Sequence, residues 1–395
     1  MGRVYFCTER EFPRGDAGAN RILHMAKALQ IEGWDTVVCS MGHSKKEHWS
    51  EENQQYIYQT VKYYTIPEFG FGKFGRVFRR FVAGKYCCGF LKKAKLETGD
   101  VVIVYSSNYS FCKTLYKFVE QKKGTKLLYD VVEWHQPFQF DRWSTRYIYK
   151  SFEKSFKNLF PATGEVIVIS ECLKDHFSKL GCRVLKLPIY ITPDNTFSNG
   201  SKSNDIINLI YPGNPYNKDS LETMLKSIEA LSEKNKAKVR FHLTGVKKSV
   251  LEMCVPNNVD LLISLIDAGI VLVHEWLEYD ELMKLYDEID FAFIARPNNI
   301  VTQANFPSKV PELMNRGIPV IITSTGDIAD YITDGVDAIL MSDCTVDDGS
   351  RALNRCLEMD HDEIVQMHNN AKQTARTKFD YRLSAKSFSD FLKYN

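Results

Sequence analysis

The chain has 395 residues, of which 44% are hydrophobic and 25% are charged. These values are typical of globular proteins and argue against a disordered chain, and the length suffices for two domains of about 100–200 residues each. The net charge of +2 gives no general attraction to nucleic acid, so we expect no nucleic-acid partner. None of the 10 cysteines forms a Cys-x-x-Cys pair, so neither a zinc motif nor a redox motif is expected.

Short apolar runs alternate with segments of helical periodicity along the first half of the chain. The runs that we expect to be strands are residues 3–7, 35–40, 100–106, 126–132 and 165–170. Amphipathic segments such as 18–33 and 171–181 follow some of these runs. Continuous apolar strands between helices are typical of a parallel sheet covered on both faces, so the pattern predicts a doubly wound α/β domain.

A polar stretch without periodicity, residues 192–205, then interrupts the pattern and predicts a linker. After it, the alternation restarts with expected strands at 207–213, 239–245, 271–274, 291–296 and 318–323, and expected helices at 220–234, 279–289 and 306–317. We therefore predict two Rossmann-like domains, residues 1–195 and 206–370, and a C-terminal helix in 371–395 that packs back on the first domain. Ligands of such sheets bind beyond the carboxyl ends of the strands, so we expect the site in the cleft between the domains.

Two loops of the first domain carry candidate binding residues. Gly15 and Gly18 precede a helix, where glycine lets a ligand approach the backbone and the helix N-terminus favours anionic groups. A turn that needs glycine for its geometry alone is the alternative. Glu133 and His135 follow the strand at 126–132 and lie among aromatic residues, which suits the faces and hydroxyls of a sugar. Packing of those aromatic residues between the domains is the alternative.

The second domain carries candidate cations in two loops. Lys218 follows a Gly/Pro/Asn loop and precedes a helix, which suits a phosphate contact, although most lysines are solvated surface residues. Arg296 ends an expected strand, where a guanidinium could hold a diphosphate. Lys309 and Glu312 lie three residues apart on the next helix, and the plainest interpretation is a surface pair worth roughly 0.2–0.5 kcal/mol.

Residues 69–96 contain basic and aromatic residues and no acid. Such a helical segment is typical of docking on an anionic membrane surface, and a solvated basic face is the alternative. The basic residues that we expect to dock are Arg76, Arg79, Arg80, Lys85, Lys92 and Lys93. The chain has neither a signal-peptide pattern nor a run of about 18 apolar residues, so we expect a cytoplasmic protein that can bind the inner face of the plasma membrane.

With these pieces in place, the chain resembles a family 4 glycosyltransferase of the GT-B fold over nearly its whole length. The resemblance is carried by the segments "PRGDAGANRI", "VIVISECLKDHF", "YPGNPYNKDSL" and "FPSKVPELMNRGIPVI", the last followed by "GDIADYITDG". A Pro-x-Lys-x-x-Glu helix that ends at Gly-x-Pro-Val is typical of a subgroup active in bacterial surface-polysaccharide assembly.

The resemblance implies a hexosyl- or N-acetylhexosaminyl-transferase that retains the anomeric configuration and needs neither a metal nor a cofactor. It implies a UDP- or GDP-linked sugar donor on the second domain and a glycan or lipid-linked acceptor on the first. By motif, Lys218 matches the lysine that contacts the diphosphate, Glu312 the glutamate that holds the ribose, and Gly18 the glycine near the donor. The donor site would also include Pro307, Ser308 and Lys309.

The chain departs from the family pattern at two positions. Ala304 stands where the first glutamate of the Glu-x7-Glu motif is expected, and Pro212 and Gly213 stand where an arginine usually precedes the lysine. We expect Arg296 to supply the missing charge, and we expect Lys218, Arg296 and His135 to be the catalytic residues. A nucleotide-sugar 2-epimerase and a non-catalytic binding protein of the same fold are the alternative functions.

Overall fold

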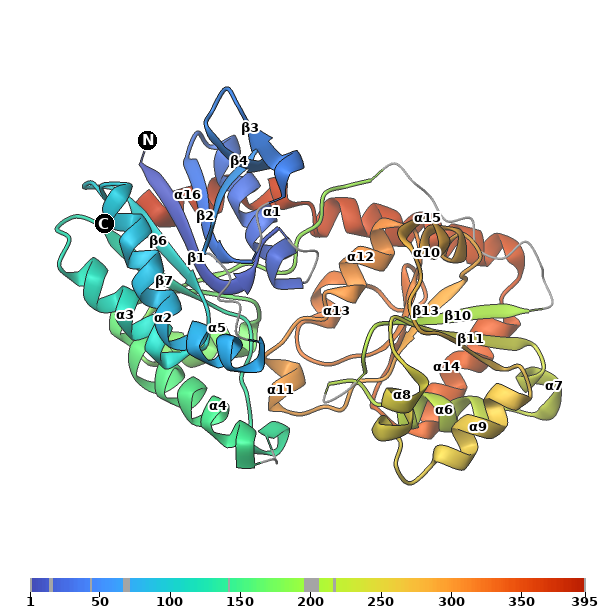
Figure 1. The fold of residues 1–395 in the computed structure, drawn as a ribbon. Coiled ribbons are helices and arrows are strands. Elements are labelled where there is room, and N and C mark those ends of the chain that lie inside the picture. Colours follow the sequence, from blue (N-terminus) through green and yellow to red (C-terminus); the bar gives the residue numbers. More distant parts are fainter. Residues whose placement is uncertain are drawn as a thin grey trace. The chain divides into compact units, whose positions relative to one another are not determined.

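The computed structural model describes residues 2–13, 17–42, 45–66, 72–140, 143–194, 206–215 and 218–393, without the side chains of 66, 72–81, 143 and 144 (Figure 1). The chain forms two compact units. The first comprises Met1–Thr192 and Tyr381–Asn395, and the second comprises Pro193–Asp380. Each unit contains a largely parallel sheet with helices in the connections, which confirms the predicted fold class of two Rossmann-like α/β domains.

The first unit is built on a nine-stranded sheet with the order β3-β4-β5-β2-β1-β6-β7-β8-β9. β1 lies between β2 and β6 and pairs in parallel with both. The strands are β1 (Arg3–Glu11), β2 (Asp35–Met41), β3 (Trp49–Ser50), β4 (Gln55–Tyr58), β5 (Val61–Ile66), β6 (Val101–Tyr105), β7 (Lys126–Val131), β8 (Glu165–Val168) and β9 (Arg183–Lys186).

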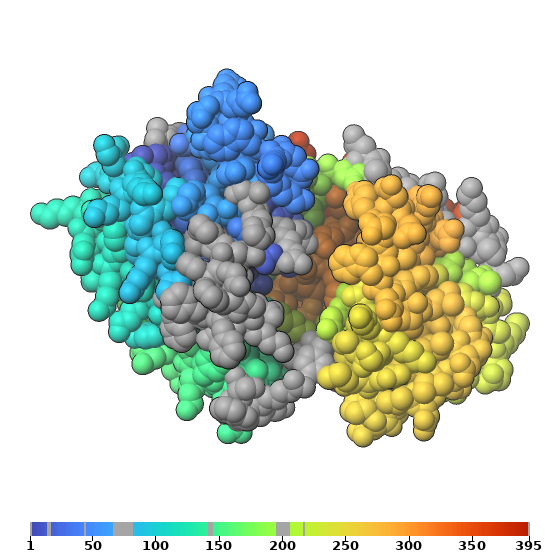
Figure 2. Space-filling view, in the orientation of Figure 1, coloured from blue at the N-terminus to red at the C-terminus, as the bar shows by residue number. Residues whose placement is uncertain are grey.

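The antiparallel edge of this sheet, β3-β4-β5, was not predicted from the sequence. Its strands are short, and β4 is only half-buried, so they lack the apolar runs that mark the central strands. The β3–β4 hairpin projects from the surface of the unit as a blue protrusion in Figure 2.

Helices of the first unit follow from local sequence signals. Asn108 and Ser170 cap the helices that follow them, each accepting a hydrogen bond from a backbone N–H two or three residues on. The helical segments are α1 (Ala17–Ile31), η1 (Lys46–His48), α2 (Gly72–Lys93), α3 (Tyr109–Glu120), η2 (Pro137–Phe140), α4 (Trp143–Lys154), η3 (Ser155–Leu159), η4 (Pro161–Thr163), α5 (Glu171–Lys179), η5 (Tyr381–Ser384) and α16 (Ala385–Lys393).

The last helix completes the core of the first unit. Phe388, Phe391 and Leu392 of α16 are buried in the same hydrophobic cluster as residues of β1 and α1. Trp34 donates a hydrogen bond from Nε1 to Ser389 Oγ at 2.9 Å. The guanidinium of Arg183 lies 3.9 Å from the centre of the Phe391 ring. The unit is therefore assembled from both ends of the chain.

A buried ion pair ties α1 to β7 in the first unit. Arg21 donates from Nε to Asp130 Oδ2 at 2.7 Å and from Nη2 to Asp130 Oδ1 at 2.8 Å. Its Nη1 donates to the carbonyls of Leu187 and Pro188, each at 3.0 Å. Both side chains are almost fully buried, so each charge depends on the other for compensation.

The second unit is built on a six-stranded, fully parallel sheet with the order β12-β11-β10-β13-β14-β15. Its central strands are buried on both faces, as their apolar sequences predict. The strands are β10 (Ile207–Pro212), β11 (Val239–Thr244), β12 (Val271–His274), β13 (Phe291–Ile294), β14 (Val320–Thr323) and β15 (Ala338–Met341).

Helices of the second unit are shorter than the sequence pattern suggested. The helix expected over 220–234 is divided in two because Ser232 caps a new helix. The helix expected over 306–317 begins only at Lys309, after Pro307. The helices are α6 (Leu221–Glu229), α7 (Glu233–Lys236), α8 (Lys248–Cys254), α9 (Val259–Asp267), α10 (Tyr279–Tyr286), α11 (Ile300–Gln303), α12 (Lys309–Asn315), α13 (Ile328–Tyr331), α14 (Val346–Glu358) and α15 (His361–Lys378).

We predict that Gly349→Ala destabilises the protein. Gly349 of α14 faces Ser227 of α6, and an added Cβ would lie 2.8 Å from Ser227 Cβ and closer still to its Oγ. Forced overpacking of this kind costs about 1–3 kcal/mol. Gly89→Ala is the matched control, because Gly89 lies inside α2 with no atom within 4 Å of an added Cβ. Urea unfolding should show a loss for Gly349→Ala and none for Gly89→Ala; equal midpoints would contradict the close packing of α6 and α14.

We also predict that Arg21→Met destabilises the protein, because Asp130 would stay buried without its counter-charge. Removing one partner of a buried pair costs roughly 3–5 kcal/mol. Urea unfolding measures the loss, and Arg21→Met combined with Asp130→Leu should cost less than the sum of the two single changes. Lys157→Ala, which removes an exposed pair with Glu153, serves as the control and should leave the midpoint unchanged. Additive losses in the double variant would show that the two charges are not coupled.

Candidate functional site

The order of strands in the second unit places two site residues on diverging loops. β10 lies between β11 and β13, so the connections that leave β10 and β13 run to opposite sides of the sheet. In open α/β sheets this switch point opens a crevice beyond the carboxyl ends of the strands. Lys218 lies in the loop after β10, and Arg296 lies two residues after the end of β13. The topology therefore brings these two predicted cations to one end of the sheet.

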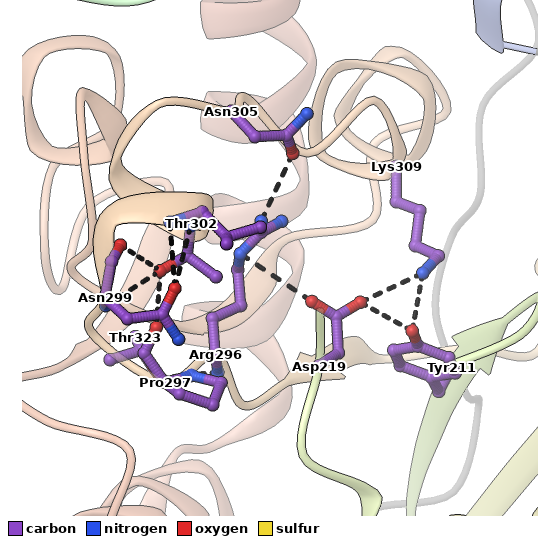
Figure 3. A network of polar contacts seen from close by, with 10 residues as sticks. Tyr211, Asp219, Arg296, Pro297, Asn299, Thr302, Asn305, Lys309 and Thr323 are labelled. Carbon is purple, nitrogen blue, oxygen red and sulfur yellow. Dashed lines mark hydrogen bonds and ion pairs between the residues drawn. The ribbon is translucent and has the colours of Figure 1, made fainter. Parts of the chain in front are cut away.

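Asp219 is the centre of a polar network at this point (Figure 3). Its Oδ2 accepts hydrogen bonds from Tyr211 Oη at 2.5 Å and from Lys309 Nζ at 3.1 Å. Its Oδ1 lies 3.6 Å from Arg296 Nε. Lys309 Nζ also donates to Tyr211 Oη at 2.6 Å, and Arg296 Nη2 donates to Asn305 Oδ1 at 3.3 Å. Loops after β10 and β13 and the start of α12 are thus joined through one carboxylate.

This network holds more positive than negative charge. Arg296 and Asp219 have side chains only 2% and 5% exposed, whereas Lys309 is 22% exposed. Burial alone would raise the pKa of Asp219, but the charges of Arg296 and Lys309 outweigh it and lower that pKa. Burial lowers the pKa of Lys309, Asp219 opposes this effect, and the charges of Arg296 and Lys218 add to it. Two cations per carboxylate, with Lys218 nearby, favour an anionic ligand.

Gly213 leaves room beside this network. It follows β10 with φ of +87°, a left-handed conformation that glycine adopts without strain. An added Cβ would lie 3.8 Å from Lys309 Cε, so the backbone of the loop runs close to the lysine side chain. Bare backbone beside an ammonium group is suited to close approach of a phosphate.

The remaining residues predicted from the FPSKVPE segment lie at the start of α12. Pro307 is buried, Ser308 is half-buried and Glu312 is exposed in the first turn of the helix. Tyr286 has a pKa raised to about 12, chiefly by burial and further by the negative charge of Glu312. The ammonium of Lys309 turns to Asp219 and Tyr211, so a surface pair with Glu312 is the poorer account of Lys309.

Ala304 is fully buried at the end of α11, where the family pattern expects a glutamate. The next residue, Asn305, supplies the carboxamide oxygen that accepts from Arg296. The network of the second unit thus uses Asp219 and Asn305, which sequence analysis did not single out. Asp219 follows Lys218 directly, and that adjacency was the available signal.

The first unit contains a cavity of about 480 Å³ at the carboxyl ends of β1, β6 and β7. This is the switch point of its sheet, because β1 lies between β2 and β6. The polar residues that line it include Glu9, Arg10, Tyr105, Ser106, Asp130, Glu133 and His135. Glu9 accepts from Ser106 Oγ at 3.2 Å and from Asn108 Nδ2 at 2.8 Å, which fixes its carboxylate at the cavity wall.

Glu133 and His135, predicted as a pair from the sequence, meet in the wall of this cavity. His135 Nε2 lies 2.9 Å from Glu133 Oε2, and the imidazole is held edge-on between Phe140 and Phe152. His135 Nδ1 is buried without a hydrogen-bond partner among the described residues. The contact through Nε2 orients the imidazole in the cavity wall.

Gly18 is explained by packing at the edge of the same cavity. An added Cβ would lie 2.9 Å from Arg10 Cδ and 3.0 Å from Tyr105 Cε1. The glycine therefore lets the first turn of α1 approach two cavity residues. Gly15 lies outside the described residues.

The residues predicted to dock on a membrane lie on α2. Lys85, Lys92 and Lys93 are exposed there, whereas the side chains of Arg76, Arg79 and Arg80 lie outside the described residues. Over the part of the chain that the structure describes, no helix has the length and apolar character needed to cross a membrane. In that same part, no three His, Cys, Asp or Glu side chains are grouped so that they could hold a metal ion.

Residues 207–359 match the family model of glycosyl transferases group 1, whereas no curated protein matches the sequence significantly. A glycosyltransferase from Rickettsia africae has 13% identity, 100% coverage of both chains and a TM-score of 0.67. Sucrose-phosphate synthase from Thermosynechococcus elongatus has 12% identity, 99% and 98% coverage and a TM-score of 0.71. Anabaena HepE, determined in complex with UDP, has 13% identity, 99% coverage of both chains and a TM-score of 0.64. The resemblance to GT-B glycosyltransferases is thus confirmed in the fold, and the second unit is the part of the chain that is similar to glycosyl transferases group 1.

Proposed function

We propose that the protein transfers a hexosyl or N-acetylhexosaminyl group from a UDP- or GDP-linked donor to a glycan or lipid-linked acceptor, with retention of configuration. The observation that carries the proposal is the excess of positive charge around Asp219 at the switch point of the glycosyl transferases group 1 domain. A nucleoside diphosphate is an anionic ligand of the kind that such a site favours. A complex with UDP is recorded for the structurally similar Anabaena protein.

The second unit would bind the donor. Lys218 and Lys309 would contact the diphosphate. The positive charge of the buried Arg296, which lies next to Asp219, would add to the electrostatic attraction for the diphosphate. Pro307 and Ser308 would form the wall beside the phosphates, and the exposed carboxylate of Glu312 would accept from the ribose hydroxyls. These cations stabilise the negative charge that develops on the leaving diphosphate, an electrostatic effect that needs no proton transfer.

The first unit would bind the acceptor, and we propose its cavity as the place where the acceptor binds. Glu133 and His135 would contact sugar or acceptor hydroxyls from the cavity wall. Gly18 would allow the start of α1 to lie against the same cavity. We therefore assign His135 a substrate contact and Glu133 the role of orienting its imidazole.

In the reaction that we propose, the bond from the anomeric carbon to the diphosphate oxygen breaks first, which leaves an oxocarbenium-like sugar. The acceptor oxygen then bonds to the same face of the anomeric carbon. Its proton passes to the departing phosphate oxygen, so the products are the glycosylated acceptor and a nucleoside diphosphate. In this route no side chain acts as the base, and His135 contributes a substrate contact.

The buried methyl group of Ala304 favours a second candidate function, a binding protein of the same fold without transfer activity. A 2-epimerase would convert the nucleotide sugar without an acceptor. The role that we propose in bacterial surface-polysaccharide assembly rests on the FPSKVPELMNRGIPVI segment.

We predict that UDP or GDP raises the melting temperature of the protein. Binding at 100 times the dissociation constant stabilises the native state by about 2.7 kcal/mol. Lys218→Ala should weaken nucleotide binding by about 10–100-fold, because a hydrogen bond to a charged group is worth roughly 1.5–3 kcal/mol. Lys226→Ala removes a partly exposed lysine of the same unit and serves as the control.

Sugar transfer is assayed with UDP-, GDP-, dTDP- and CMP-sugars and candidate acceptors. Conversion of the donor without an acceptor would favour the epimerase. Nucleotide binding without any product would favour the binding protein, and neither binding nor product would overturn the proposal.

We further propose that the basic residues of α2 bind an anionic membrane surface, where a lipid-linked acceptor is found. Each basic residue near such a surface contributes about 1 kcal/mol, so Lys92→Glu with Lys93→Glu should weaken binding to phosphatidylserine vesicles by about 30-fold or more. The matched control reverses Lys122 and Lys123, which are exposed after α3 in the same unit. Adding Arg79→Glu and Arg80→Glu should abolish sedimentation with the vesicles. Equal binding by wild type and the α2 variants would contradict the proposal.

A further inference from the structure

We propose that Asp219 is a positioning residue of the donor site, which holds the ammonium of Lys309 beside Gly213 and keeps it charged for the donor phosphates. The inference rests on the proposed function, since it assigns a role within the same site. Asp219 does not itself contact the phosphates in this scheme, because like charges would repel.

The geometry gives Asp219 control over Lys309. Its carboxylate is 5% exposed and lies 3.1 Å from Lys309 Nζ, and Tyr211 Oη bridges the two groups at 2.5 and 2.6 Å. A flexible lysine side chain has many rotamers, and two partners restrict it to one. The ammonium also lies 4.1 Å from the centre of the Tyr211 ring, so a third contact fixes the same position.

Asp219 contacts the ammonium of a side chain that stays partly exposed. Lys309 keeps 22% of its side chain exposed, whereas Asp219 and Arg296 are nearly inaccessible. Arg296 compensates the other carboxylate oxygen from the buried side, at 3.6 Å from Oδ1. Of the two cations that share this carboxylate, Lys309 is the one that a ligand can reach.

The charges around Lys309 show why a counter-ion is needed. Burial lowers its pKa, and the positive charges of Arg296 and Lys218 lower it further. Asp219 is the group that opposes these effects.

The other titratable groups near Lys309 carry no compensating charge at its ammonium. Tyr211 is neutral, since burial and then Asp219 raise its pKa well above the ordinary value. Cys344, near Asp219, and Cys254, near Tyr211, have raised pKa values, chiefly through burial, and are neutral thiols. Glu312, on the same helix, is exposed and faces Tyr286.

Asp219→Asn keeps the shape of the side chain and removes the charge that raises the pKa of Lys309. The lysine then loses its proton at a lower pH than in the wild type. A neutral amine gives up the charge-assisted hydrogen bond to phosphate, which weakens binding by about 10–100-fold.

The first measurement needs no nucleotide. Competitive acetylation with acetic anhydride, followed by peptide mass spectrometry, reports the deprotonated fraction of Lys309 at each pH. We expect the labelling midpoint of Lys309 to fall in Asp219→Asn and to stay near the wild-type midpoint in Tyr211→Phe, which keeps the carboxylate. The midpoint of Lys226 in the same digests is the internal reference.

The second measurement is the dissociation constant of UDP and of GDP at about pH 7 and about pH 9, both below the ordinary lysine pKa of about 10.4. The ratio of the two constants should rise by about tenfold or more in Asp219→Asn relative to the wild type, if deprotonation removes a hydrogen bond of this strength. Lys309→Arg combined with Asp219→Asn should restore the wild-type ratio, because arginine stays protonated over this range. A residue with a purely structural role would weaken binding equally at both pH values.

These outcomes distinguish a failure of the role proposed for Asp219 from a failure of the proposed donor site. Unchanged labelling and an unchanged ratio in Asp219→Asn would overturn the role of Asp219 while leaving nucleotide binding intact. A shifted labelling midpoint in a protein that binds neither UDP nor GDP would overturn the donor site and reduce the Asp219–Lys309 contact to a structural ion pair. Urea unfolding of each variant shows whether the fold is retained, and Asp219→Ala, which also removes the charge, is measured in its place if Asp219→Asn unfolds.

Discussion

The second unit is organised around one buried carboxylate placed between two cations. Asp219 joins the loop after β10, the residue beyond β13 and the first residue of α12 through contacts with Tyr211, Arg296 and Lys309. These three segments lie far apart in the sequence and meet only where the strands end at the switch point. The carboxylate compensates part of the positive charge, and the positive charge that is left uncompensated favours an anionic ligand.

The first unit also contains a pair of buried charged side chains, but in this pair the positive and negative charges are equal in number. Its buried pair, Arg21 and Asp130, is matched one to one and has two hydrogen bonds between side chains. The neighbouring cavity is lined by the carboxylates of Glu9 and Glu133 and by His135, groups that recognise hydroxyls. The two switch points thus favour different ligands, an anion in the second unit and a polyhydroxyl compound in the first. That division agrees with a donor and an acceptor bound by separate domains.

The positions that depart from the family pattern lie in or beside the Asp219 network. The loop after β10 has Gly213 where a cation is expected, and the side chain of Lys309 lies close to that glycine. Ala304 is buried where a carboxylate is expected, while the neighbouring Asn305 binds Arg296. The substitutions therefore do not leave the site without charge, but they distribute the charge over different residues.

Sequence by itself determined the fold class, because apolar runs and amphipathic segments are local patterns that report burial directly. It also proposed Lys218, Lys309, Glu133 and His135 as candidate site residues, since each lies just beyond an expected strand or at the start of a helix. The antiparallel edge β3-β4-β5 was missed because its strands are too short for a clear period.

Only the tertiary structure decided which charged side chains pair with one another. Asp219 and Lys309 are 90 residues apart in the chain, and Arg21 and Asp130 are 109 apart. No local pattern records which buried charges compensate one another, because that depends on which loops the strand order brings together.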